Sequence, residues 1–172
     1  MTKDFVNPFT PVVGKVPLHI AGREEIIADI EGALAGAGND PAIISLLVGP
    51  RGMGKTALLS HFADTAESSG WVTARVTCVA GMLEDILIRT QRATRHLVDI
   101  EPARKIKGAG IADFISLELE DSPRELSNWR SRMDDILDAL AECNTGLLVT
   151  IDEVNPSIDE MATLVAAFQH FL

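Results

Sequence analysis

Cysteine is scarce in this 172-residue chain, and the two cysteines stand apart. Cys78 and Cys143 occupy unrelated positions, with no metal-type spacing around them. Structural zinc sites need cysteine or histidine ligands at short, regular spacings. The four histidines form no spaced cluster either: His19, His61, His96 and His170. The sequence therefore predicts two free thiols in a reducing compartment and assigns no metal site to the histidines.

Basic residues are also few. Fifteen Lys and Arg against 25 Asp and Glu give a formal net charge of −10 and a pI near 4.8. Because nucleic acids are polyanions, this balance disfavours a self-sufficient nucleic-acid reader. One basic island interrupts the acidic chain: Arg89, Arg92, Arg95, Arg104, Lys105 and Lys107. It is interpreted either as a solvated face or as a contact with nucleic acid or a neighbouring subunit's nucleotide.

The chain also has no long apolar run and few aromatic residues. The N-terminal stretch MTKDFVNPFTPVVGKVP has no apolar core of a signal peptide. No apolar stretch approaches the length of a membrane span. A cytoplasmic protein without membrane contact is therefore expected. Aromatic residues make up only 5% of the chain, so Trp71 and Trp129 are interpreted as packing residues.

The chain nevertheless has the composition of a globular protein, with 47% apolar residues, and the length of one domain. Prolines at positions 8, 11 and 17 predict an extended arm over residues 1–18. Ile26, Ile27, Ile30 and Leu34 then follow one another at helical spacing.

Apolar or β-branched strands alternate with amphipathic helices in the rest of the chain. Strands are predicted at 42–48, 71–79 and 146–151. Helices are predicted at about 55–69, at 82–97 and from the capping box at 122–125 to about 143. Residues 115–120 alternate like an edge strand, and capping boxes at 122–125 and 157–160 predict helix starts. This order predicts an α/β domain with a parallel sheet.

The stretch GPRGMGKT at 49–56 matches the phosphate-loop pattern G-x-x-x-x-G-K-[ST] between a predicted strand and a predicted helix. Glycines let successive backbone N–H groups point at an anion, and the following helix adds its positive N-terminal end. Lys55 is expected to reach the β- and γ-phosphates and Thr56 to hold Mg²⁺. Arg51 is interpreted as a solvated loop side chain or as a phosphate or partner contact. The residues expected to bind nucleotide here are Gly49, Pro50, Arg51, Gly52, Met53, Gly54, Lys55, Thr56, Ala57 and Leu58.

Two carboxylates end the third predicted strand in the stretch LLVTIDEVN. A strand over 147–151 delivers Asp152 and Glu153 to the carboxyl edge of the sheet, where open α/β sheets bind ligands. Asp152 is expected to hold the Mg²⁺ shell. Glu153 is expected to polarise a water for attack on the γ-phosphate.

These stretches together carry a family resemblance. LHIAGREEIIADIEGAL, GPRGMGKT and LLVTIDEVN resemble the AAA+ ATPases, and most of all bacterial ATP-binding proteins with an origin-recognition-like or STAND-type ATPase domain. A Gly-Arg-Glu box, here Gly22-Arg23-Glu24, is the hallmark of that group, and the preceding NPFTP also looks like it.

The resemblance implies a three-layer α/β/α P-loop domain over residues 19–172, with ATP and Mg²⁺ as ligands. It implies that the segment from Ile20 to Arg23 lines the adenine pocket and that Leu58 packs on the base. Carried over by position, Lys55 is the phosphate lysine, Thr56 and Asp152 are the magnesium residues, and Glu153 is the water-activating base.

The resemblance also leaves parts of the family pattern unlocated. The family's fourth strand, its lid and its sensor and finger residues would follow Leu172. The expectation is therefore a C-terminally truncated chain with an incomplete sheet, weak turnover by itself, and partner binding or self-association through the missing region. The missing strand would lie between the strands at 42–48 and 146–151. These two strands are therefore expected either to pair directly or to leave a gap in the sheet with unpaired backbone groups.

Several functions stay open at this point. The first is ATP hydrolysis as the motor or switch of a larger regulatory protein, which Glu153 favours. The second is a nucleotide-gated binding module with negligible turnover. A DNA-binding initiator-like ATPase is a further alternative, while a small-molecule kinase would need an acceptor pocket that the sequence does not indicate.

Overall fold

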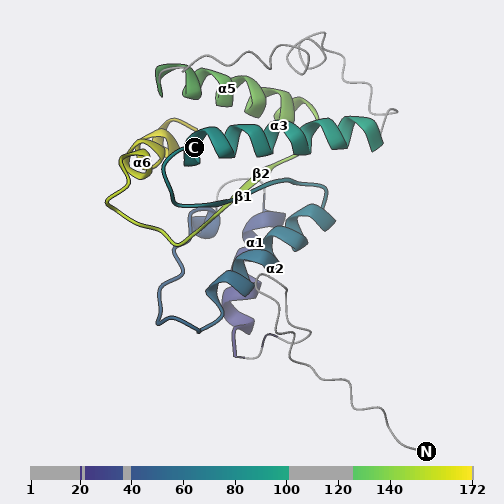
Figure 1. Cartoon of the computed structure of the whole chain (residues 1–172). Coiled ribbons are helices and arrows are strands. Elements are labelled where there is room, and N and C mark those ends of the chain that lie inside the picture. The colour runs from purple at the N-terminus through teal and green to yellow at the C-terminus, as the bar shows by residue number, and fades with distance from the viewer. Residues whose placement is uncertain (1–19, 21, 37–39, 101–125, 172) are drawn as a thin grey trace, which may run out of the picture. The chain divides into compact units, whose positions relative to one another are not determined.

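The computed structural model describes residues 20, 22–36, 40–100 and 126–171 (Figure 1). The chain divides into two compact units, an N-terminal unit, Met1–Ala66, and a C-terminal unit, Glu67–Leu172, and each is described by itself. The predicted arm at 1–18, the alternating segment at 115–120 and the capping box at 122–125 lie outside the described residues.

The N-terminal unit begins with the predicted amphipathic helix. Helix α1 spans Glu24–Ala35 and buries Ala33, while its four predicted apolar positions are half-buried. Glu24 and Glu25 stand in its first turn, where negative charge complements the positive end of a helix. At the other end, the N–H of Gly36 donates to the carbonyl of Gly32 at 2.9 Å. The helical spacing of the apolar residues and both ends of α1 agree with one another, and the predicted helix is confirmed.

The predicted strand at 42–48 is wrong. A short 3₁₀ helix, η1, occupies Pro41–Ile43, and no strand follows it before the phosphate loop. The Asp40 side chain accepts the N–H of Ala42 at 2.8 Å, which starts a helical turn in place of a strand. Leu46 and Val48 are 70% and 84% exposed. An apolar run becomes a strand only when a neighbouring backbone pairs with it, and none of the described residues does so.

Helix α2, Lys55–Ser68, follows the phosphate loop as predicted. Its first intrahelical bond joins the N–H of Leu58 to the carbonyl of Gly54 at 3.0 Å. It ends before Gly70, whose φ of 84° is left-handed and whose N–H donates to the carbonyl of Glu67 at 3.0 Å. Glycine adopts that conformation without strain, so the predicted helix stop is confirmed.

The sheet of the C-terminal unit consists of two parallel strands. Strand β1 spans Val72–Thr77 and β2 spans Leu147–Asp152, in a register that pairs Val72 with Leu147 and Thr77 with Asp152. Both strands were predicted. Of the two alternatives for residues 42–48 and 146–151, direct pairing is wrong, because within the described residues β2 pairs with β1 alone.

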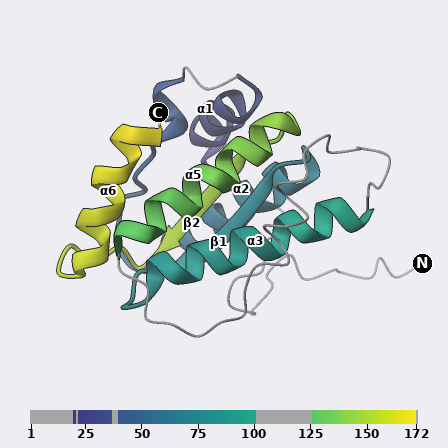
Figure 2. The ribbon, with the colours of Figure 1, turned by 90° about the horizontal axis from the view of Figure 1, so that it is seen from above.

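Three helices cover the sheet on the side of its buried apolar residues. They are α3, Met82–Ile100, α5, Leu126–Glu142, and α6, Asp159–Phe171. Helices α3 and α5 lie side by side over the strands (Figure 2). The core of this unit is one cluster made of Val72, Ala74, Val76, Cys78, Met82, Leu83, Ile86, Leu87, Trp129, Met133, Ile136, Leu140, Leu164 and Ala167.

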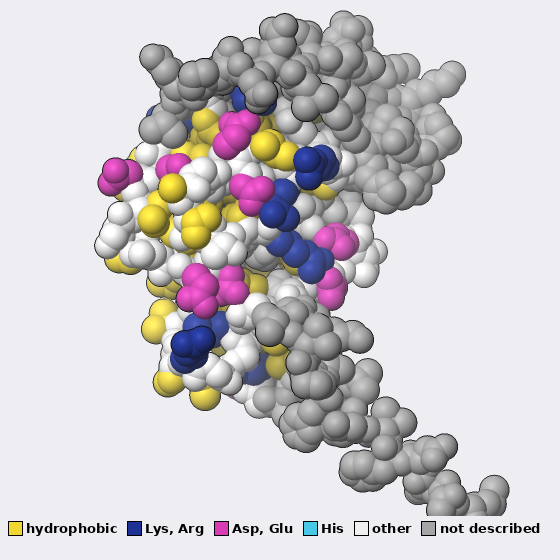
Figure 3. All heavy atoms as spheres, in the orientation of Figure 1, with side chains coloured by type: hydrophobic (Ala, Val, Ile, Leu, Met, Phe, Trp, Pro, Cys, Tyr) yellow, Lys and Arg dark blue, Asp and Glu magenta, His cyan; other side chains and the backbone are white. Residues whose placement is uncertain are grey.

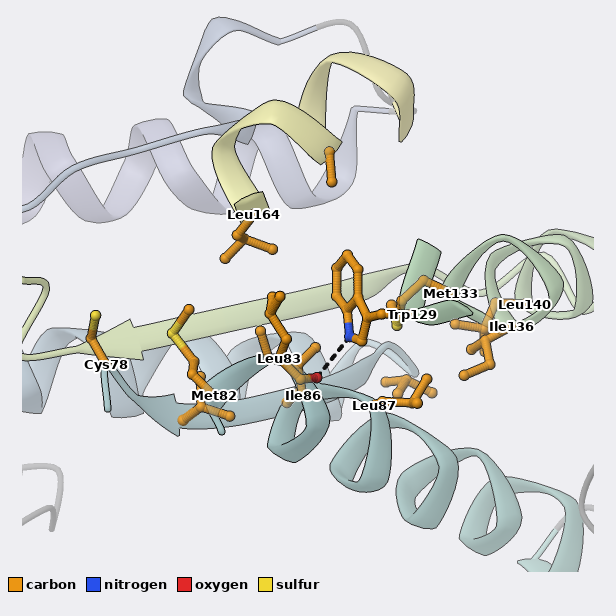
Figure 4. Packing of buried hydrophobic residues seen from close by; sticks show 14 residues of the cluster. Cys78, Met82, Leu83, Ile86, Leu87, Trp129, Met133, Ile136, Leu140 and Leu164 are labelled. Carbon is orange, nitrogen blue, oxygen red and sulfur yellow. Dashed lines mark hydrogen bonds between the residues drawn. The ribbon is translucent and has the colours of Figure 1, made fainter. Parts of the chain in front are cut away.

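Trp129 joins α5 to α3 in this core. It is 5% exposed, and its indole N–H donates to the carbonyl of Leu83 at 2.7 Å (Figure 4). A buried indole is stable when its one donor finds a partner. Trp129 is therefore a packing residue, as its sequence context predicted.

The capping box predicted at 157–160 is wrong, although a helix does begin at Asp159. The N–H of Ser157 donates to Oδ1 of Asn155 at 3.0 Å. The Glu160 carboxylate accepts instead from the N–H groups of Gly81 at 2.8 Å and Leu83 at 2.9 Å, at the start of α3. A carboxylate is favourable at that positive helix end. Because the Glu160 carboxylate is bonded there, it does not cap α6, the helix to which Glu160 belongs.

Candidate functional site

The phosphate loop, residues 49–56, has the backbone that its glycines predict. Gly52 and Gly54 have φ angles of 84° and 81°, a left-handed region that other residues rarely adopt. Nothing lies within 4 Å of a Cβ built at either position, so backbone conformation rather than crowding calls for glycine. The loop is exposed up to Gly54, and helix α2 begins directly after it.

The Lys55 ammonium lies against this loop. Its Nζ donates to the carbonyl oxygens of Gly49 and Pro50, both at 2.9 Å. Lys55 is also the first residue of α2, whose opening N–H groups have no acceptor within the helix. A flexible cation and a helix N-terminus thus stand together at one end of a glycine turn, which is an arrangement suited to a phosphate group.

The remaining residues of the predicted nucleotide segment differ in exposure. Met53 is 51% exposed, and Pro50 and Arg51 are exposed as well. Arg51 makes no ion pair with the described residues, and both of its interpretations stay predictions. Thr56 and Ala57 are half-buried, and Leu58 is 3% exposed. Contact of Leu58 with a base stays a prediction.

The Gly-Arg-Glu box forms the turn that starts α1. Gly22 has a φ of 73°, and its N–H donates to Oε1 of Glu24 at 3.0 Å. Hydrogen bonds from the backbone of Glu24 itself, then Gly22 and Arg23, hold the pKa of the Glu24 carboxyl below its ordinary value. The sequence reasoning missed this capping role of Glu24, although a carboxylate in the first turn signals it. Ile20 and Arg23 are half-buried, and their place at an adenine ring stays a prediction.

The second group of predicted residues forms the acidic turn, residues 152–155, at the carboxyl end of β2. Asp152 is the last residue of the strand and is half-buried, whereas Glu153 is exposed. Glu153 has a φ of 55°, and its N–H donates to Oδ1 of Asp152 at 2.9 Å. A left-handed conformation is uncommon for glutamate, and such residues gather at functional sites.

The phosphate loop and the acidic turn belong to separate units, and each is described by itself. In the N-terminal unit the structure joins Lys55 to Gly49 and Pro50. In the C-terminal unit it joins Asp152 to Glu153. A shared magnesium site of Thr56 and Asp152 stays a prediction.

The basic island is partly neutralised where the structure describes it. Arg89 Nε pairs with Asp85 Oδ2 at 2.9 Å along α3, and Arg92 is exposed. Basic and acidic side chains stand next to one another on the face shown in Figure 3. Residues 104, 105 and 107 and the side chain of Arg95 lie outside the described part. A contact of this face with nucleic acid or a second subunit stays a prediction.

Cys78 and Cys143 are both free thiols, as predicted; Cys78 is buried and Cys143 half-buried. In the described part of the chain, no group of three or more His, Cys, Asp or Glu side chains could hold a metal ion. None of the described helices combines the length and apolarity needed to cross a membrane.

Comparison with known proteins gives one match. A family model described as AAA ATPase domain matches residues 19–171, a range that contains the Gly-Arg-Glu box, the phosphate loop and the acidic turn. No curated protein and no solved structure matches the chain significantly.

Proposed function

Since the chain belongs to the family of AAA ATPase domains, we propose that it binds Mg²⁺–ATP at the phosphate loop and hydrolyses it with Glu153 as general base. The observation that carries the proposal is the loop itself. Two left-handed glycines, Gly52 and Gly54, stand directly before Lys55 at the start of α2. The family supplies the nucleotide, and the loop supplies the chemistry that receives its phosphates.

The phosphate loop fits an anion in three ways. Its left-handed glycines let backbone N–H groups turn toward an anion, α2 offers the positive end of a helix, and Lys55 adds a full charge. The carbonyl bonds of Lys55 are replaceable, because a charge-assisted bond to a phosphate oxygen is stronger than one to a neutral carbonyl. We expect Lys55 to leave Gly49 and Pro50 for the β- and γ-phosphates.

The chain also offers the oxygen donors that a magnesium ion prefers. The Thr56 hydroxyl follows Lys55 on α2, and the Asp152 carboxylate ends β2. Hydroxyl and carboxylate oxygens are hard ligands, suited to Mg²⁺ beside substrate phosphates. When bound, the ion would neutralise charge on the β- and γ-phosphates during transfer. If Thr56 and Asp152 hold one ion together, Thr56→Ala and Asp152→Asn should each lower the affinity for Mg²⁺. In the double variant the two losses should then be non-additive.

Glu153 is the residue proposed to accept a proton from the attacking water. Its carboxylate is exposed at the carboxyl end of β2, and no hydrogen bond or ion pair engages it within the described residues. A carboxylate left accessible in this way can approach a water molecule. A protein that only binds nucleotide has no need of it, so Glu153 favours hydrolysis over sensing alone.

The experiment is steady-state phosphate release by the wild type, Glu153→Gln and a matched control, Glu142→Gln. Glu142 is an exposed glutamate at the end of α5. A general base is worth about 10²–10⁴-fold, so Glu153→Gln should slow release by that factor and Glu142→Gln should not. Both variants should bind an ATP analogue as the wild type does. Equal rates for Glu153→Gln and wild type would remove Glu153 from the mechanism.

We further propose that hydrolysis drives or resets a larger regulatory protein. Conformational change coupled to the γ-phosphate is the usual way in which such domains produce an output. If the wild type binds Mg²⁺–ATP but releases no phosphate above the background without protein, the alternative of a nucleotide-gated binding module is supported instead.

A further inference from the structure

Cys78 is a buried thiol at the carboxyl end of the sheet, directly after β1. It is 5% exposed and belongs to the apolar cluster shown in Figure 4. Its backbone N–H donates to the carbonyl of Asp152 at 2.9 Å, which continues the ladder between the two strands. Cys78 therefore holds the first residue of the acidic turn.

The side chain of Cys78 holds the last residue of the same turn. Its Sγ accepts the backbone N–H of Asn155 at 3.4 Å. Its S–H points either to the carbonyl of Asn155 at 3.7 Å or to Sδ of Met161 at 4.0 Å, one at a time. A thiol is a weak donor and a weak acceptor, and here both capacities are used.

Two exposed residues, Glu153 and Val154, lie between these two anchors. At the far end, Asn155 also accepts the N–H of Ser157 at its Oδ1 (3.0 Å) and the N–H of Ile158 at its carbonyl (3.2 Å). Within this stretch, the N–H of Glu153 donates to Oδ1 of its neighbour Asp152. Glu153 also stands in the left-handed region, a conformation that persists only where the surrounding structure fixes it. The place of its carboxylate therefore depends on how firmly Asp152 and Asn155 are held.

We propose that Cys78 is a positioning residue for Glu153, anchoring both ends of the acidic turn so that the carboxylate keeps one direction. This inference rests on the proposed role of Glu153 in ATP hydrolysis. Cys78 itself touches no reacting atom and acts through the backbone of Asp152 and Asn155.

The surroundings of Cys78 make it a firm anchor. Glu160, at the start of α6, accepts from the N–H groups of Gly81 and Leu83 at the start of α3. The next residue, Met161, contacts the Cys78 sulfur. The thiol thus lies beside the place where the start of α3 and the first turn of α6 are joined by bonds of their own. A movement of the acidic turn has to break its contacts with Cys78.

The kinetic test compares Cys78→Ala and Cys78→Ser with a matched control, Cys143→Ala, which changes the other free thiol. Cys78→Ala should lower kcat for ATP hydrolysis about 10–100-fold, since a misplacement of roughly 1 Å costs about 10²-fold. The affinity for a magnesium–ATP analogue should not change. Cys78→Ser keeps a donor and an acceptor on a shorter side chain and should recover part of kcat. Cys143→Ala should match the wild type.

A double variant separates positioning from a general loss of structure. In a Glu153→Gln background, Cys78→Ala should lower kcat no further, because the group that it positions is already gone. If the two losses multiply in full, Cys78 does not act through Glu153, and the proposal is overturned.

Hydrogen exchange tests the anchoring without reference to turnover. Cys78→Ala should speed exchange at the amides of residues 153–155, while the β1–β2 ladder stays protected. If Cys78→Ala does not fold, Cys78→Ser takes its place in both measurements. Unchanged exchange overturns the proposal even where hydrolysis is confirmed. If exchange is faster in Cys78→Ala but the wild type shows no turnover, the anchoring by Cys78 stands and the proposed function alone is contradicted.

Discussion

The indole ring of Trp71 lies against the backbone of Gly146, where the two strands of the sheet begin. Each residue directly precedes a strand, and the N–H of Val72 donates to the carbonyl of Gly146 at 2.9 Å. A Cβ on Gly146 would overlap carbons of the six-membered ring of Trp71. Glycine is therefore required at this position by the space that the ring occupies.

Replacing Gly146 with alanine should lower the free energy of unfolding by about 1–3 kcal/mol, the usual cost of overpacking. The control is Gly32→Ala in the middle of α1, where nothing lies within 4 Å of an added Cβ. That change should raise the free energy by about 0.5–1 kcal/mol, because alanine is the better helix former. Urea unfolding measures both. A Gly146→Ala protein as stable as the wild type would mean that the ring moves aside without cost.

Glu153→Gly should make the protein more stable while abolishing the turnover proposed for it. A left-handed conformation costs a residue with a Cβ about 1–2 kcal/mol, more than the roughly 0.5–1 kcal/mol that glycine loses in entropy. Asn144→Gly is the control, since Asn144 has a φ of 51° but asparagine tolerates this region. The free energy of unfolding of Asn144→Gly should change less than that of Glu153→Gly. Thermal unfolding compares the two, and a destabilised Glu153→Gly would show that the carboxylate makes a stabilising contact.

Lys55→Ala should weaken nucleotide binding strongly, because it removes a charge-assisted contact that no neighbour replaces. Arg51→Ala removes an exposed cation from the same loop and should have a small effect if the solvated interpretation holds. Isothermal titration with a magnesium–ATP analogue measures both affinities. Unchanged affinity in Lys55→Ala counts against the site, and an equal loss in Arg51→Ala would place that arginine on the phosphates.

Glu24 should titrate below the glutamate value of about 4.3 found in peptides. Its folded pKa is lowered by backbone N–H groups that bind the carboxylate, so it stabilises the fold above the unfolded pKa. That contribution is lost as the pH falls through the lower, folded pKa. Carbon-detected NMR titration gives the midpoint directly. The stability difference between wild type and Glu24→Gln should shrink with acidification, and a midpoint at or above the peptide value would contradict the capping bonds.

Local signals in the sequence predicted most of the C-terminal unit. Helical spacing located α3, and β-branched runs located β1 and β2, because each pattern reflects which face of an element is buried. The run at 42–48 has the same apolar character but no strand pairs with it in the described part, and a residue pattern cannot supply a partner. Sequence patterns give candidates for strands, and pairing decides among them.

The candidate site shows the same division between local and distant causes. The glycines of the phosphate loop lie within a few residues of one another, and Asp152 and Glu153 are neighbours in sequence. Each pattern is therefore local and could be recognised. The role of Cys78 depends on the backbone of Asn155, which lies 77 positions away, and Glu160 bonds residues at a similar distance. No spacing rule reaches that far along a chain.

The register of the two strands also has a consequence for the order of folding. Val72 pairs with Leu147, so the ladder forms only after the long segment between them has been looped back. Non-local pairing of this kind slows folding, because chain entropy is lost before contacts form. We therefore expect helices to form before the sheet, and the ladder bond between Cys78 and Asp152 to close near the end. The acidic turn would then be among the last parts of this unit to reach its native geometry during folding.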